Sequence, residues 1–189
     1  MPEWIAEASR APRARITGIV YLLYFLAAVL GQTLASRKLV VYGVAFNIIA
    51  NAFYVALTLL FYELFKPVNK GVSLVAALFS LVGCAIATLD LFHLAPSRMS
   101  PLLFFGPYCL LLGYLILRST FLPRILGVLM MLAGLGWLIV LLPRLPLFMS
   151  RYIEGLGILA EGLLMLWLLV RGVNVSRWRE QAAEGLAAR

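Results

Sequence analysis

The sequence predicts an all-α polytopic membrane protein, a bundle of six transmembrane helices. The chain has 189 residues, of which 63% are hydrophobic and 13% charged, and its mean hydropathy is +0.99. Soluble domains are roughly 45–50% apolar and about 25% charged. The chain contains six apolar blocks, and each is close to the length of about 20 residues that spans a hydrocarbon core. Because these blocks use most of the chain, we expect no separate soluble domain.

Short connectors rich in Pro, Gly, Ser, Lys and Arg divide the blocks, as expected of segments that end helices. They read SRKLVVYG, KPVNKG, APSRMS, RSTFLPR and PRLPLFMSR in chain order. The first block also carries tyrosines, which favours a retained helix over a cleaved signal peptide. The expected helices are Ile16–Leu34, Val44–Phe65, Val72–Leu94, Pro101–Leu117, Ile125–Leu142 and Tyr152–Val170.

The last three helices carry residues with packing consequences. Pro107 frees a backbone carbonyl within the fourth helix, and Pro123 starts the fifth, where a missing N–H costs nothing. Small residues on the fifth and sixth helices predict that these two pack tightly, because small side chains let backbones approach. Homo-oligomerisation through a remaining glycine face is an open alternative. The small residues are Gly127, Gly134, Gly136, Gly155, Gly157, Ala160 and Gly162.

The charged residues indicate an orientation. Eleven Lys and Arg fall on the side of the two termini and five on the other, so the positive-inside rule predicts cytoplasmic termini in the cell inner (plasma) membrane. The expected organisation is a cytoplasmic segment over residues 1–15, the bundle over 16–170 and a cytoplasmic tail over 171–189. Val175–Ala188 is expected to be an interfacial helix, with a solvated tail as the alternative.

Composition also argues against several partners and cofactors. The net charge of +8 comes from residues at the ends of apolar blocks, where Lys and Arg meet lipid headgroups. A nucleic-acid site would instead need these residues clustered in one patch. Cys84 and Cys109 lie within apolar blocks without a CxxC motif. The single histidine argues against bis-histidine haem and a three-histidine zinc site. We therefore expect the lipid bilayer as a partner and no cofactor.

Three stretches resemble the bacterial integral-membrane family catalogued as domain of unknown function 4386. They are RITGIVYLL at Arg15–Leu23, FYELFKPVNKGVSLVAALF at Phe61–Phe79, and LLLGYLILRSTFLPRILGVLMMLAGLGWL at Leu110–Leu138. With the general layout the resemblance spans Arg15–Val173. It implies a six-helix bacterial membrane protein and brings no known activity or catalytic residue.

Glu161 is the sharpest candidate for a functional residue, because it falls halfway along the last predicted helix. A charge at this depth costs about 2.5–3.5 kcal/mol or more, so its carboxyl is expected to hold a proton or share charge with a cation. The functional interpretations are a proton relay, an ion ligand or a ligand anchor. The structural interpretation is a protonated side chain that hydrogen-bonds between helices.

Helical spacing gives Glu161 its expected neighbours. A polar stripe on the first helix contains Thr17, Tyr21, Tyr24, Ala28 and Gln32. Similar stripes follow the second and third helices, and at roughly 1.5 Å per residue some members reach the depth of Glu161. The alternative is ordinary polar contact between helices, worth about 0.6 kcal/mol each. The predicted ligand-binding set is Glu161, Tyr24, Asn51, Tyr54, Cys84 and Tyr108.

A second group of titratable residues is expected near the outer surface. Its members are Asp90, His93 and Glu154, and the arginines expected nearby are Arg98, Arg144 and Arg151. They form either a belt of ion pairs, which needs no special purpose, or an outer vestibule leading to Glu161. On the cytoplasmic side, Glu63 precedes Lys66 by three residues, so we expect these two to pair.

These patterns leave three hypotheses for function. The favoured one is a non-enzymatic receptor, carrier or accessory subunit that binds a small or lipidic ligand around Glu161. The second is a small transporter in which Glu161 couples a proton or cation. The third, least favoured, is an intramembrane enzyme that uses Asp90, His93 and Glu154.

Overall fold

The computed structural model describes residues 11–95, 99–141 and 146–187. Within these ranges every regular element is a helix, which confirms the all-α prediction. The helices are α2 (Ala11–Ser36), α3 (Val40–Phe65), α4 (Lys70–Leu91), α5 (Leu102–Arg118), α6 (Arg124–Val140), α7 (Leu147–Val170) and α8 (Val175–Ala187).

Four of these helices are long and apolar enough to cross a membrane. The spans are Ala14–Ser36, Val40–Phe65, Lys70–Leu91 and Met149–Val170. Helices α5 and α6 are also apolar but have 17 residues each, so each rises only about 25 Å against a hydrocarbon core of about 30 Å. The chain is thus an all-helical membrane protein, while the count of six crossings stays a prediction.

Three helix starts lie four or five residues before the predicted ones, and α2 begins at Ala11 instead of Ile16. The connector between α2 and α3 is only Arg37–Leu39, because Lys38 turns the chain with φ of 64° and α3 begins at Val40. Val40 and Val41 were predicted to lie in the connector because their neighbours are typical of turns, but they belong to the helix. Helix α7 begins directly after Pro146, five residues earlier than expected, since proline is readily placed at a helix start.

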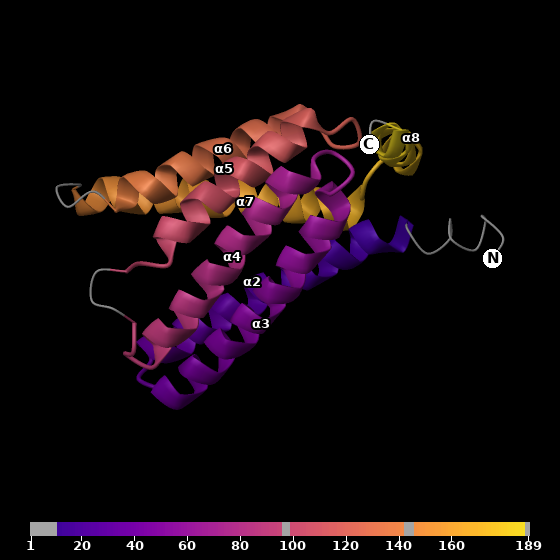
Figure 1. Ribbon diagram of the computed structural model, residues 1–189. Coiled ribbons are helices and arrows are strands. Elements are labelled where there is room, and N and C mark those ends of the chain that lie inside the picture. Colours follow the sequence, from indigo (N-terminus) through magenta and orange to yellow (C-terminus); the bar gives the residue numbers. More distant parts are fainter. Residues whose placement is uncertain (1–10, 96–98, 142–145, 188–189) are drawn as a thin grey trace.

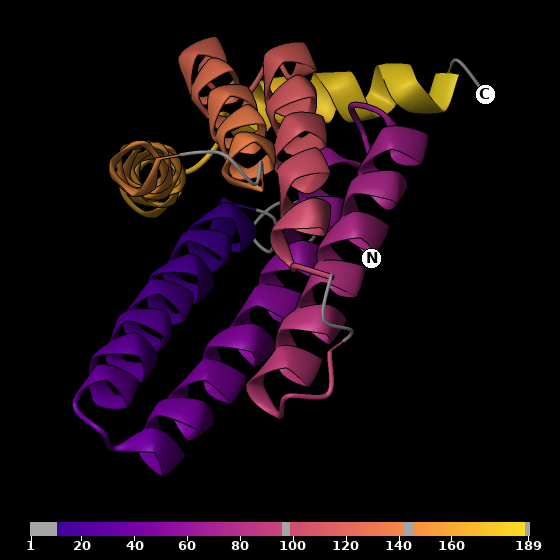
Figure 2. The same ribbon diagram turned by 90° about the vertical axis from the view of Figure 1, so that its left-hand side faces the viewer.

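Helices α2 to α7 form a closed ring in chain order. Each of α2 to α6 packs on the next helix, and α7 packs back on α2. Helices α2, α3 and α4 run beside one another, and α5 lies along α6 (Figures 1 and 2). Figure 1 shows that the start of α2 and the whole of α8 lie at the same end of the structure. This end, called the α8 end below, also holds the loops that join α3 to α4 and α5 to α6.

Glycines set the closest contacts between α5 and α6. A Cβ at Gly113 would lie 2.7 Å from the carbonyl oxygen of Gly127, and one at Gly134 would lie 2.7 Å from the carbonyl oxygen of Gly106. Two glycines of α6, Gly127 and Gly134, therefore face α5, although they were predicted to pack on α7. The contact between α6 and α7 instead uses Gly136 and Gly157.

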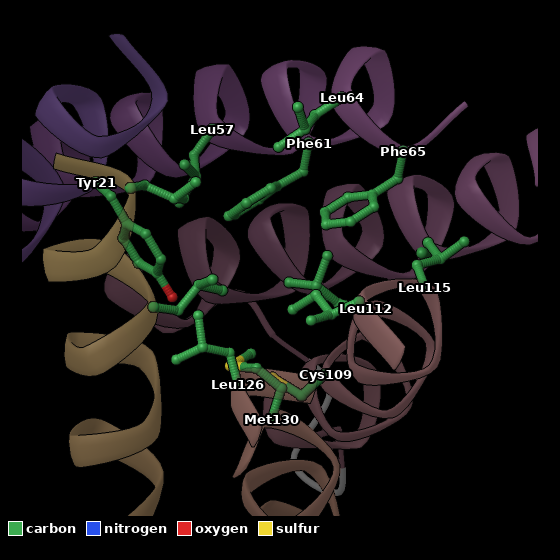
Figure 3. Packing of buried hydrophobic residues seen from close by; sticks show 14 of the residues in the cluster. Tyr21, Leu57, Phe61, Leu64, Phe65, Cys109, Leu112, Leu115, Leu126 and Met130 are labelled. Atoms are coloured by element: carbon green, nitrogen blue, oxygen red, sulfur yellow. The ribbon is translucent and has the colours of Figure 1, made fainter. Parts of the chain in front are cut away.

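The interior of the ring is filled with aromatic and aliphatic side chains. Figure 3 shows Tyr21 of α2 directed into a cluster with Phe61 and Phe65 of α3 and Leu112 of α5. Large apolar side chains are also exposed on the outside of all six helices. Exposed apolar surface of this extent marks an interaction site, and here it suits contact with lipid. Examples are Ile19, Leu59, Leu78, Leu103, Leu132 and Leu159.

Helix α8 packs against the end of the ring. The indole N–H of Trp178 donates to the carbonyl of Leu64 over 2.9 Å, one of the last carbonyls of α3, which have no partner within their own helix. Gln181 accepts from the backbone N–H of Thr120 and donates to the carbonyl of Arg118. The C-terminal segment is thus a docked helix and not a frayed tail. Its predicted place at the lipid headgroups stays a prediction.

The close contact of α5 with α6 gives a testable prediction. Replacing Gly113 by Ala places a methyl group against the backbone of α6, so we expect the free energy of unfolding to fall by about 1–3 kcal/mol. The matched control is Gly162→Ala on α7, where a Cβ meets nothing within 4 Å. This control should leave stability unchanged or slightly raised. Thermal unfolding in detergent measures both, and equal effects of the two variants would contradict the packing described.

Candidate functional site

Glu161 lies inside the ring on α7, with 8% of its surface exposed. The hydroxyl of Tyr21 on α2 donates to its Oε2 atom over 3.1 Å. Trp137 of α6 makes the second side-chain hydrogen bond to the same carboxyl. Two neighbouring helices of the ring therefore each supply one donor to the acid.

Two glycines bring these donors within reach. A Cβ at Gly18 would lie 2.6 Å from the backbone nitrogen of Leu169, so α2 contacts the backbone of α7 one turn before Tyr21. A Cβ at Gly157, one turn before Glu161, would lie 2.7 Å from the indole ring of Trp137. Because both positions lack a side chain, the phenol and the indole can approach α7 closely.

Tyrosines from three helices surround the acid. The rings of Tyr24 and Tyr54 lie 4.7 Å apart, and those of Tyr54 and Tyr108 lie 6.1 Å apart. Each of these three side chains is near enough to interact electrostatically with Glu161. We call the group formed by the carboxyl and its aromatic neighbours the polar centre. It consists of Glu161, Tyr21, Tyr24, Tyr54, Tyr108 and Trp137.

Not every hydroxyl group of the polar centre has a hydrogen-bond partner among the described residues. The hydroxyls of Tyr24 and Tyr54 make no hydrogen bond with any described residue. The hydroxyl of Tyr108 is fully buried and also has no partner within the described part of the chain. Leaving a buried hydroxyl unpaired costs about 1–3 kcal/mol. The centre can therefore accept a further polar atom.

Two residues of the predicted set belong to a different hydrogen-bond cluster. Asn51 of α3 donates to the backbone carbonyl of Cys84 on α4 over 2.8 Å and also contacts the hydroxyl of Thr88. Cys84 is itself buried. This cluster joins α3 to α4, which matches the interpretation of polar contact between helices.

The expected outer vestibule is only partly covered by the structure. Asp90 and His93 are exposed and Glu154 is half-buried, and none of them forms an ion pair with another described residue. Arg98 and Arg144 lie outside the described residues, and Arg151 is exposed. Within those same ranges, no three His, Cys, Asp or Glu side chains are placed to hold a metal ion.

The predicted pair on the α8 side is confirmed. The ammonium of Lys66 lies 2.6 Å from the carboxylate of Glu63. Both side chains are more than two-fifths exposed, so the pair adds little stability. It lies at the end of α3, beside the loop to α4.

Tyr21 and Trp137 were not predicted as site residues. Tyr21 belongs to the polar stripe of the first helix. The predicted neighbours of Glu161 were chosen by the depth of their backbone positions, which leaves out the length of the Tyr21 side chain. Trp137 lies among apolar residues and glycines, a pattern typical of packing. The signal available was a lone tryptophan beside Gly136, in a helix expected to face Glu161.

The fold and the site together define an all-helical membrane protein with a carboxyl inside its ring of helices. The chain belongs to the family described as Domain of unknown function (DUF4386), whose model matches residues 16–100 and 97–172. An uncharacterized protein of Archaeoglobus fulgidus is 34% identical over 124 residues, which are 61% of this chain and 74% of that protein. No solved structure matches the chain. The family resemblance is confirmed, and the bacterial origin stays a prediction.

A double-mutant cycle tests the contact between α2 and α7. Tyr21→Phe removes the donor and Glu161→Met removes the acceptor, so we expect a coupling free energy of about 0.6 kcal/mol, up to about 1.7. Unfolding of the four proteins in mixed micelles gives this value. The matched control replaces Tyr21→Phe by Tyr24→Phe, which breaks no hydrogen bond to Glu161. Similar coupling in both cycles would show that the Tyr21 hydroxyl is not the partner of the acid.

Proposed function

We propose that this protein is a small proton-coupled carrier in which Glu161 binds and releases the coupling proton. The observation that carries the proposal is the buried hydrogen bond between Tyr21 and Glu161. It joins the first and the last helix of the ring at mid-membrane depth, and no cation among the described residues pairs with the acid. A carboxyl in this setting is expensive to ionise, so its charge and its contacts are coupled.

The packing of the polar centre favours a proton over a larger ion. Tyr54 and Tyr108 are 5% and 2% exposed, and the side chains around the acid are in contact with one another. A proton binds to the carboxyl without displacing any of them. The titratable groups that face Glu161 are the phenols and one thiol, which are neutral around pH 7 in their ordinary state. They are Tyr21, Tyr24, Tyr54, Tyr108 and Cys109.

Protonation of Glu161 changes the hydrogen bonds that hold the ring closed. Helix α7 joins the two ends of the described helix series, by packing on both α6 and α2. An ionised carboxyl strengthens its hydrogen bonds to Tyr21 and Trp137, whereas a protonated one needs an acceptor for its own O–H. The contact between α7 and α2 therefore has two chemically different states, as a carrier that alternates between conformations needs.

The arrangement of the helices supports a proposed topology of six crossings. Helices α5 and α6 lie in the same ring as the four long spans, which supports placing them in the same bilayer. The two shorter helices then imply local thinning of the bilayer, a modest cost. With the α8 end in the cytoplasm, both termini and the larger number of Lys and Arg side chains face that compartment of the inner membrane.

A second candidate function is binding of a small or lipidic ligand at the polar centre, as a receptor or an accessory subunit. It is favoured by the three phenol hydroxyls of Tyr24, Tyr54 and Tyr108, which lack partners among the described residues. A ligand with oxygen acceptors and an apolar body would satisfy them. Side chains of the centre must move to admit it, so extra stability on adding such ligands is the sign to look for.

The fluorescence of Trp137 tests proton binding without knowledge of a substrate. In a variant that keeps Trp137 and replaces Trp4, Trp167 and Trp178 by Phe, we expect the emission to titrate with pH in nanodiscs. The physical reason is the hydrogen bond between the indole and Glu161, whose strength depends on the charge of the carboxyl.

The controls for this titration are two matched substitutions. Glu161→Gln should abolish the transition, and Glu154→Gln, on the same helix two turns away, should leave it unchanged. A transition that persists in Glu161→Gln, or no transition at any pH at which the protein stays folded, would refute the proposed proton site.

A further inference from the structure

A small cavity lies between the polar centre and the α8 end, bounded by α3, α4 and α5. Its polar lining comes from Thr58, Tyr62, Ser73 and Tyr108, and its apolar lining includes Ala76 and Ala77. The cavity has a volume of about 10 Å³, which is the space that about one water molecule needs. Tyr62 and Ser73 lie close to the loop that joins α3 to α4, so the cavity reaches toward the α8 end.

The groups around this cavity are suited to hold water. The Tyr108 hydroxyl is buried and lacks a partner among the described residues. Ser73 donates its hydroxyl proton to the carbonyl of Tyr62 over 3.3 Å, and its oxygen keeps lone pairs free to accept. The Thr58 hydroxyl donates to the carbonyl of Tyr54 and lies 2.5 Å from the Ser80 hydroxyl. A buried water usually makes two to four hydrogen bonds, and these groups supply them.

We propose that this cavity binds a water molecule through Tyr108 and that protons reach Glu161 from the α8 end through it. The proposal rests on the proposed function, because it names the side from which the coupling proton enters. The water separates the exposed end of α3, where Lys66 and Glu63 pair, from the tyrosines of the polar centre. Tyr108 is the residue that belongs to both the cavity lining and the centre.

The transfer balances with the groups present. The water accepts one proton from the α8 side and releases another to the oxygen of Tyr108. The phenol releases its own proton toward the centre, so it ends as a neutral phenol. The ionised carboxyl of Glu161 takes up that proton and becomes a carboxylic acid. No group changes its oxidation state, and only the proton from solution is consumed.

The stability of Tyr108→Phe tests whether water is present. If a water molecule satisfies the hydroxyl, its removal loses a hydrogen bond and raises the equilibrium constant for unfolding by about 2- to 10-fold. If the cavity is dry, the substitution removes an unpaired polar atom and the equilibrium constant falls. A fall would overturn the proposal, and this result does not depend on proton binding at Glu161.

The route is tested by the speed of the Trp137 response to a pH jump in proteoliposomes of known orientation. Ala77→Leu fills the cavity, and we expect it to slow the response to a jump on the α8 side by about tenfold, as for a barrier raised by one lost hydrogen bond. The final Trp137 fluorescence after the jump should not change. Ala85→Leu is the matched control, because Ala85 lies on the same helix and is exposed. Tyr108→Phe should slow the response as well.

The outcomes separate this inference from the proposed function. An unchanged rate in both Ala77→Leu and Tyr108→Phe, or a response only to jumps on the opposite side, would overturn the route while leaving the proton site intact. Absence of any pH response in the parent protein would instead refute the proton site. In that case the sign of the stability change in Tyr108→Phe still decides whether the cavity holds water.

Discussion

The cost of placing a carboxyl in hydrocarbon is the constraint on which the arrangement depends. Glu161 lies in the middle of a membrane helix, where water is not available to solvate it. In this protein the acid faces the interior of the ring, where donors on α2 and α6 form hydrogen bonds to it. These donors come from helices far apart in the chain. The closed order of the helices, with α7 between α6 and α2, is what brings them together.

Glycines supply the geometry that this solution needs. Apolar helices gain little from association in lipid, which is as apolar as their side chains, so close packing and hydrogen bonds must hold them together. Gly18 and Gly157 remove side chains where a phenol and an indole have to approach α7. The glycines of α5 and α6 do the same for the close contact between those two helices. Small residues thus serve both the scaffold and the polar centre, and their positions alone do not tell the two apart.

Much of the fold follows from the sequence, but the site follows only in part. Apolar block length located all six ring helices, because the bilayer fixes how long such a block must be. The predicted starts of α3 and α7 were too late because Val40 and Leu147 lie next to residues typical of turns. Glu161 was found from its depth alone. Tyr21 was not, since the length and direction of its side chain depend on how α2 leans on α7. Asn51 shows the opposite case: its depth fits the centre, yet its partner is the carbonyl of Cys84.

The closure of the ring by α7 has a consequence for how this protein is made. A ribosome delivers α2 first and α7 last among the ring helices, so α2 to α6 are made before the helix that closes the ring. Until synthesis of the final span, the phenol of Tyr21 lacks the acceptor that it has in the finished protein. Trp178 and Gln181 follow later still, and they cover the ends of α3 and α5 only after the ring has closed. The contacts of α7 with α2, and of α8 with the ring, therefore form only after the other described helices have been made.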